Sequence, residues 1–303
     1  MRHFLDITDL SRVELDSVLR RAVMPIGELG RPLDGHGVAL IFEKPSNRTR
    51  QSMEMAVAQL GGHPVYTRGE EVGFDVREPV EDVTKIMAGY HAVLAARVVE
   101  HSVVTRMAAL DVVPVVNMLS EWSHPLQGLA DALTMQQSLG PLDGKTVAYV
   151  GDYNNVARSL AEVSTMLGAH VRLGCPSGFE ASPAELERIG LLGGGAGSVT
   201  QFSRAIDAVE GAQAVHTDTW TSMGQEAEKA ERVRVFEAFQ VDDQVMAAAA
   251  SGALFFHCLP AYRGYEVAAS VIDGPRSRVI EQGHNRLHAA RGLLSWLIEA
   301  NQA

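Results

Sequence analysis

The stretch Val38-Ala39-Leu40-Ile41-Phe42-Glu43-Lys44-Pro45-Ser46-Asn47-Arg48-Thr49-Arg50 is an apolar run that passes directly into a polar turn with two arginines. Residues 38–42 have the length of a buried strand, and residues 51–60 have a helical pattern. A helix start offers free N–H groups and a positive dipole end, and arginines add forked donors. The stretch therefore predicts a phosphate site between a strand and a helix. The alternative is a solvated helix start with two surface arginines.

Three further polar clusters follow predicted strands in the same way. In open parallel α/β sheets, ligands bind beyond the carboxyl ends of the strands. Four clusters at that edge favour one composite site over four unrelated loops. The three clusters are His124-Pro125-Leu126-Gln127 after 112–116, Asp218 to Gly224 after 214–217, and His257-Cys258-Leu259-Pro260 after 254–256.

Strand and helix patterns alternate along most of the chain, which predicts parallel sheets with helices on both faces. A Ser11-x-x-Glu14 capping box marks the first helix. The break from Gly140 to Gly144 interrupts the alternation and indicates a domain boundary. We expect an α/β fold of two doubly wound parallel-sheet domains, 1–139 and 140–283, with a C-terminal helix at 284–303 that packs back on the first domain.

The predicted elements can be given by range. The strands are 38–42, 63–67, 93–96, 112–116, 146–150, 170–173, 198–201, 214–217 and 254–258. Besides the helix that follows Ser11 and one that Ser182 caps, the helices are 51–60, 80–89, 101–109, 127–138, 155–167, 203–210, 242–250 and 285–300.

Composition and charge narrow the class of protein. The 303 residues are 46% hydrophobic and 21% charged, as in ordinary globular proteins. The net charge of −11 argues against nucleic acid as the main partner. Only two cysteines occur, Cys175 and Cys258, so we expect no disulfide framework and a cytoplasmic location. We see no signal peptide and no apolar run of ~18 to 20 residues that would span a membrane.

Several cofactor sites are disfavoured. The glycine run 193–197 follows a helix rather than a strand, so it indicates a helix end and not a nucleotide loop. The turn Gly151 to Val156 lacks dinucleotide-type glycine spacing and suits a zwitterionic ligand better. No GxxxxGK[ST] motif occurs, and His284 and His288 are more typical of a surface than of a metal site. We expect neither a metal nor a cofactor.

Taken together, these segments resemble the aspartate/ornithine carbamoyltransferase family over nearly the whole chain. Residues 46–50 resemble its carbamoyl-phosphate loop, usually Ser-Thr-Arg-Thr-Arg. The Asp-x-Trp-x-Ser-Met-Gly segment at 218–224 favours ornithine over aspartate as the acceptor. The resemblance implies carbamoyl transfer from carbamoyl phosphate to the side-chain amine of L-ornithine, giving citrulline and phosphate, as in arginine biosynthesis. It also implies a homotrimer with active sites at subunit interfaces.

The resemblance further implies a role for individual residues. The catalytic residues that it implies are Arg97, His124, Asp218 and Cys258. The carbamoyl-phosphate ligands that it implies are Ser46, Asn47, Arg48, Thr49, Arg50, Arg97, His124, Gln127, Cys258, Leu259 and Arg286. The ornithine ligands that it implies are Asn155, Asp218, Ser222 and Met223.

The carbamoyl transfer that the resemblance implies needs hydrogen-bond donors at the atoms where negative charge develops. Thr49, Arg97 and His124 would bind the carbonyl oxygen, while Arg48 and the helix start would hold the leaving phosphate. The phosphate can itself accept the proton of the attacking amine. The amine must be neutral, although a free alkylammonium has a pKa of ~10.4, so we expect domain closure to dehydrate the site and lower that pKa. No covalent intermediate is required.

The chain departs from the family pattern at three places, and the one in the 70–77 loop leaves the acceptor open. Asn47 replaces a usual Thr, and Tyr262 replaces a His or Phe. Glu71 stands where a neutral donor is expected, in a loop that reaches the neighbouring subunit in the family. Putrescine, lysine or an acylated ornithine are alternative acceptors, but putrescine lacks the α-carboxylate, so Asn155 and Asp218 would have no α-amino acid group to bind. A catalytically idle regulatory protein is a further alternative, and the complete set of motif residues argues against it.

Overall fold

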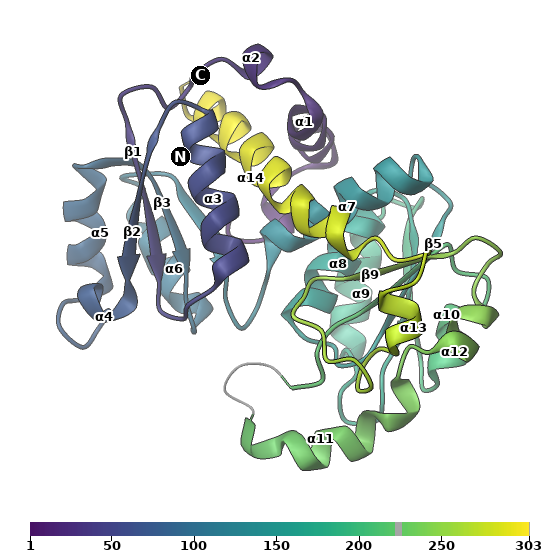
Figure 1. The fold of residues 1–303 in the computed structure, drawn as a ribbon. Helices are drawn as coiled ribbons and strands as arrows, with labels where there is room; N and C mark the ends of the chain where they lie inside the picture. Colours follow the sequence, from purple (N-terminus) through teal and green to yellow (C-terminus); the bar gives the residue numbers. More distant parts are fainter. Residues whose placement is uncertain (222–225, 303) are drawn as a thin grey trace. The chain divides into compact units, whose positions relative to one another are not determined.

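The computed structural model describes residues 1–221 and 226–302 and divides into two compact units (Figure 1). Unit 1 comprises Met1–Leu133 and His284–Ala303, and unit 2 comprises Thr134–Gly283. The first division falls inside a helix, whereas the sequence places the boundary at the Gly140–Gly144 break. In the part of the chain that the structure describes, no helix is both long and apolar enough to cross a membrane.

The sheet of unit 1 has four parallel strands in the order β2-β1-β3-β4. The strand order reverses between β1 and β3. Such a switch point is where open α/β sheets bind ligands, beyond the carboxyl ends of the strands. The strands are β1 (Gly37–Phe42), β2 (His63–Arg68), β3 (His91–Arg97) and β4 (Val115–Leu119).

Helices cover both faces of this sheet. Alternate strand residues, including Ile41 and Leu94, pack with α5 and α6 in one core, and Figure 1 shows α3 and α14 on the other side. The helices are α1 (Arg12–Val23), α2 (Ile26–Leu29), α3 (Asn47–Gln59), α4 (Gly69–Val72), α5 (Val80–Ala88), α6 (His101–Ala109), α7 (Pro125–Leu139) and α14 (Val279–Gln302), of which α7 and α14 continue into unit 2.

Unit 2 has five parallel strands in the order β7-β6-β5-β8-β9, with its switch point between β5 and β8. Val150, Val215 and Phe255 pack with α10, α12 and α13 in one core, while α8 and α9 pack on β6 and β7. The strands are β5 (Thr146–Val150), β6 (His170–Gly174), β7 (Ser198–Phe202), β8 (Ala214–Thr217) and β9 (Leu254–His257). The helices are α8 (Asn155–Met166), α9 (Pro183–Leu192), α10 (Ala205–Val209), α11 (Lys229–Phe236), α12 (Asp243–Ala248) and α13 (Ala269–Ile272).

The predicted fold class is confirmed: the chain has two doubly wound parallel sheets, and its C-terminal helix packs on the first unit. Several boundaries differ from the prediction, and two of the differences have a clear physical cause. The strand predicted at 112–116 begins at Val115, because Pro114 has no N–H for the ladder and Asp111 has a left-handed φ of 54°. Helix α3 begins at Asn47 rather than at residue 51, so the polar turn is itself the first turn of the helix.

Helix α14 lies directly against the backbone of α1 at Gly292. A Cβ at this position would lie 2.6 Å from the Val18 carbonyl oxygen and 2.7 Å from the Ala22 nitrogen. Next to it, the Arg291 guanidinium donates to the carbonyls of Ala22 and Met24 at 3.1 and 3.2 Å. These two carbonyls lie at the C-terminal end of α1. Arg291 of α14 therefore caps the helix against which α14 packs.

We expect Gly292→Ala to destabilise the protein by about 1–3 kcal/mol, because the clash is with backbone that cannot move aside. Gly283→Ala in the same helix is the matched control, since a Cβ there meets nothing within 4 Å. That control should be neutral or stabilising by up to ~1 kcal/mol. Urea unfolding of both variants measures the difference, and equal stabilities would contradict the close α1–α14 approach.

Candidate active site

The first turn of α3 follows β1, next to the switch point of unit 1, and has the features of an anion site. Ser46 is the N-cap residue, with extended backbone angles of φ −155° and ψ 114°. Its hydroxyl donates to Thr49 Oγ1 at 3.1 Å, and in the described chain it accepts no hydrogen bond from the helix backbone. The N–H groups of the turn are therefore left for a ligand, and the helix dipole adds positive potential.

Arg286 brings three helices together beside this turn. The residue is 5% exposed. Its Nη2 donates to Thr49 Oγ1 of α3 at 2.8 Å, and its Nη1 donates to Gln127 Oε1 of α7 in a short hydrogen bond. His124 Nε2 lies 3.5 Å from the same Nη1. The structure thus brings together four of the residues predicted to bind carbamoyl phosphate.

The His124 imidazole is neutral in this environment. Burial lowers its pKa well below the usual value, and the positive charges of Arg286, Arg97 and Arg48 lower it further. Protonation would add a fourth positive charge to a site already lined by three guanidiniums. The arrangement is an electropositive cluster whose charge suits a dianion, with a neutral hydrogen-bonding ring among its members.

The two arginines of the α3 turn have different surroundings. Arg48 is half-buried and close enough to His124 to affect its pKa. Arg50 is exposed, donates from Nε to Glu54 Oε1 at 2.8 Å, and lies 3.9 Å over the ring of Tyr66. The structure therefore places Arg48, and not Arg50, with the predicted ligands.

A buried polar network fixes the turn that carries His124. Ser123 Oγ donates to Asp6 Oδ1 at 3.0 Å. Asn117 Nδ2 donates to Ser120 Oγ at 3.3 Å and to the Ser123 carbonyl at 3.4 Å. These contacts could not be predicted from the sequence, because Asp6 and Ser123 lie 117 positions apart.

The loop predicted to reach a neighbouring subunit is held by ion pairs. Glu71 accepts from Arg68 Nε at 2.8 Å, so its carboxylate is paired within the chain. Arg106 binds Asp75 at 2.6 Å and Glu81 at 2.7 Å, and thereby ties the loop to α6. Glu71, which replaces the neutral residue expected from the family pattern, therefore carries a charge that is paired with Arg68.

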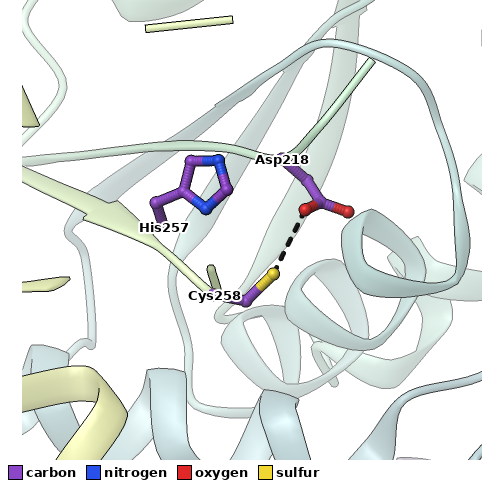
Figure 2. Close-up of side chains that lie close together, drawn as sticks. All are labelled: Asp218, His257 and Cys258. Atoms are coloured by element: carbon purple, nitrogen blue, oxygen red, sulfur yellow. Dashed lines mark hydrogen bonds between the residues drawn. The ribbon is translucent and has the colours of Figure 1, made fainter. Parts of the chain in front are cut away.

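Unit 2 carries a second set of predicted residues at its own switch point. Asp218 follows β8 and is 6% exposed, and Cys258 follows β9. Figure 2 shows the Cys258 thiol donating to Asp218 Oδ1, at 3.2 Å. The amide of Asn154 donates to the other carboxylate oxygen at 2.9 Å. Each oxygen of Asp218 therefore has a donor that fixes the carboxylate.

Asp218, His257 and Cys258 have potential ligand atoms within 4.8 Å of one another (Figure 2), but the donor set does not fit a metal. His257 Nδ1 accepts from the Leu259 N–H at 2.9 Å, and Nε2 lies 3.2 Å from Glu266 Oε1. Only the neutral ring protonated at Nε2 satisfies both contacts, which leaves no nitrogen lone pair for an ion. His257 instead holds the turn at Leu259, whose left-handed φ is 59°.

The structure also identifies a residue that the sequence did not single out. Asn154 is the N-cap of α8, and it contacts Asp218, while the predicted ligand Asn155 is the first helical residue and half-buried. Two consecutive asparagines before a helix are a capping signal that could have drawn attention to Asn154. Ser222 and Met223, predicted to bind the amino acid, lie outside the described residues.

Comparison with known proteins places both units in one family. Residues 2–137 match the model "Aspartate/ornithine carbamoyltransferase, carbamoyl-P binding domain", and residues 143–297 match "Aspartate/ornithine carbamoyltransferase, Asp/Orn binding domain". Among named relatives, the ornithine carbamoyltransferase of Acidothermus cellulolyticus is 44% identical, covering 99% of this chain and 97% of its own length. The ornithine carbamoyltransferase of Thermus thermophilus is 46% identical, and the match covers 89% of this chain and 87% of that protein.

Solved structures agree with the sequence matches. The ornithine carbamoyltransferase from Pyrococcus furiosus superposes with a TM-score of 0.94 at 39% identity, covering 98% of this chain and 97% of its own. An N-acetyl-L-ornithine transcarbamylase superposes with a TM-score of 0.88 at 29% identity, covering 98% and 100%. With matching models over both units and relatives of more than 40% identity along nearly its whole length, the chain belongs to the aspartate/ornithine carbamoyltransferase family.

Proposed function

We propose that this protein transfers the carbamoyl group of carbamoyl phosphate to the side-chain amine of L-ornithine, giving L-citrulline and phosphate. The observation that carries the proposal is the buried cluster around Arg286, which contacts Thr49 and Gln127 and, together with Arg97 and Arg48, lies close enough to His124 to lower its pKa. A cluster of this charge matches a small acyl phosphate such as carbamoyl phosphate. The names of the relatives, nearly all ornithine carbamoyltransferases, support the choice of acceptor.

In this proposal, different residues of unit 1 bind different parts of carbamoyl phosphate. Arg48 and the N–H groups of α3 hold the phosphate, which is the leaving group. Thr49, Arg97 and His124 donate to the carbonyl oxygen, where negative charge grows as the amine attacks. A neutral imidazole suits this role because it donates a hydrogen bond without releasing a full proton.

The unit 2 residues would recognise the amino acid. Asp218 pairs with the α-ammonium and Asn155 binds the α-carboxylate. Cys258 donates to Asp218, and it and the following Leu259 would contact the reacting groups. The attacking amine passes its proton to the departing phosphate, so the mechanism needs no covalent intermediate. Closure of the units on the substrates, a homotrimer and a cytoplasmic location remain predictions.

An acylated ornithine is the second candidate acceptor, because one structural neighbour is named N-acetyl-L-ornithine transcarbamylase. The Asp218 carboxylate argues for the free amino acid. An acyl group removes the positive charge of the α-nitrogen, which would leave a 6% exposed carboxylate beside a neutral amide. Citrulline formation from ornithine, with acetylornithine assayed in parallel, distinguishes the two acceptors.

We expect Arg48→Ala to weaken carbamoyl-phosphate binding at least tenfold, because a charged hydrogen bond to phosphate contributes about 1.5–3 kcal/mol. Arg50→Ala is the comparison variant, since Glu54 and Tyr66 already engage its guanidinium. The Arg50→Ala variant should lose less affinity for carbamoyl phosphate than the Arg48→Ala variant. Calorimetry of both variants tests this, and binding by the Arg48 variant within threefold of wild type would remove Arg48 from the phosphate site.

Asp218→Asn should raise the KM for ornithine far more than that for carbamoyl phosphate, because only the amino acid carries an ammonium group. The amide keeps the shape of the side chain and removes the charge. Steady-state kinetics with each substrate varied in turn measures both constants. Equal losses for the two substrates would indicate a folding defect, and no loss would exclude Asp218 from acceptor binding.

A further inference from the structure

Asn154 uses its two polar atoms for two different purposes. Its Oδ1 accepts from the backbone N–H groups of Val156 and Ala157, both at 3.0 Å, and so caps α8. Its Nδ2 donates to Asp218 Oδ2 at 2.9 Å. One side chain therefore joins the start of a helix to the carboxylate at the end of β8.

We propose that Asn154 is a positioning residue for Asp218, and that it thereby sets the affinity for the amino group of the acceptor. This inference rests on the function proposed above. Asn154 would not touch the substrate. It would act through the carboxylate that does.

The orientation of the Asn154 amide is set by the helix. A side-chain amide can flip, so that its oxygen and its NH2 group trade places. For an unconstrained side chain this flip costs little free energy. Here a turned amide would face its NH2 group toward two backbone N–H groups and its oxygen toward a carboxylate. Both contacts would become repulsive, so the NH2 group faces Asp218.

Asp218 is held from both sides and still has capacity for a ligand. Cys258 donates to Oδ1 and Asn154 to Oδ2. A carboxylate offers about four lone-pair positions, so two donors leave room for the hydrogens of an ammonium group. The neighbouring Thr217 hydroxyl donates to the Val150 carbonyl at 2.6 Å and ties the end of β8 to β5. The carboxylate is thus preorganised rather than free to rotate.

Three substitutions separate capping from positioning. Serine and aspartate are N-cap residues as good as asparagine, whereas alanine is not. Asn154→Ser keeps the cap and removes the donor to Asp218. Asn154→Asp keeps the cap and replaces the donor with a second carboxylate. Asn154→Ala removes both.

We expect Asn154→Ser to unfold near the wild-type temperature and to raise the KM for ornithine about tenfold, with the carbamoyl-phosphate KM unchanged. Asn154→Ala should show the same kinetic loss and a lower unfolding temperature. In Asn154→Asp, two adjacent carboxylates share one proton at low pH and repel each other once that proton is lost. Its kcat/KM for ornithine, relative to wild type, should therefore fall as pH rises.

Wild-type ornithine kinetics in Asn154→Ser would overturn the positioning role, as would equal losses for both substrates. The Asp218→Asn variant separates this result from failure of the proposed function. If Asp218→Asn impairs ornithine binding while Asn154→Ser does not, Asp218 acts without Asn154 and only the inference fails. If neither variant impairs it, the acceptor assignment itself fails.

Discussion

A buried guanidinium must be compensated, and the site of unit 1 is organised around that constraint at Arg286. The residue comes from the C-terminal helix α14, yet its donors reach Thr49 of α3 and Gln127 of α7. Gln127 in turn donates to Asp131 at 2.7 Å, and Asp131 is 1% exposed. A buried carboxylate one helical turn away offsets part of the positive charge and orients the amide that meets Arg286. The last helix of the chain therefore completes a site that begins at the first strand.

The two units carry opposite charges at equivalent places in their folds. Both use the switch point of a parallel sheet, where strand ends and helix starts converge. In unit 1 that edge collects Arg48, Arg97 and Arg286, within a chain whose net charge is −11. In unit 2 it presents the carboxylate of Asp218. The same architecture thus serves a phosphate in one unit and an ammonium group in the other under the proposed function.

The sequence predicted those features that depend on local pattern. Apolar runs identified the strands, and residues that follow a strand, such as Asp218 and Cys258, could be placed at the binding edge. Short helices such as α2, α4 and α13 were missed, because one turn has no periodicity to detect and forms only through tertiary contacts. Arg50 stays a predicted phosphate ligand, and in this structure its guanidinium pairs with Glu54 one helical turn away, a spacing that the sequence already shows.

Other parts of the site depend on which of two adjacent residues occupies a given backbone position. The sequence offers Asn154 and Asn155, and only the structure shows that Asn154 is the N-cap and contacts Asp218. The contacts of the turn 120–124 also could not be read from the sequence, because Asp6, which accepts a hydrogen bond from Ser123, is remote along the chain. Hydrogen bonds between distant segments leave no periodic pattern, so sequence reasoning could not predict them.

Asn154 and His257 hold the candidate site residues of unit 2 in a similar way. Asn154 uses one polar atom on backbone N–H groups and the other on Asp218. His257 uses one ring nitrogen on the Leu259 N–H and the other on the buried Glu266. In both cases the backbone contact fixes which polar atom faces the neighbouring carboxylate, so the amide cannot turn and the imidazole has one tautomer. This explains how Leu259 can keep a left-handed φ of 59° next to Cys258, since such a conformation persists only where surrounding contacts over-determine it. Under the proposed function, the geometry of Asp218 and Cys258 therefore depends on neighbouring side chains that are not assigned to the substrate.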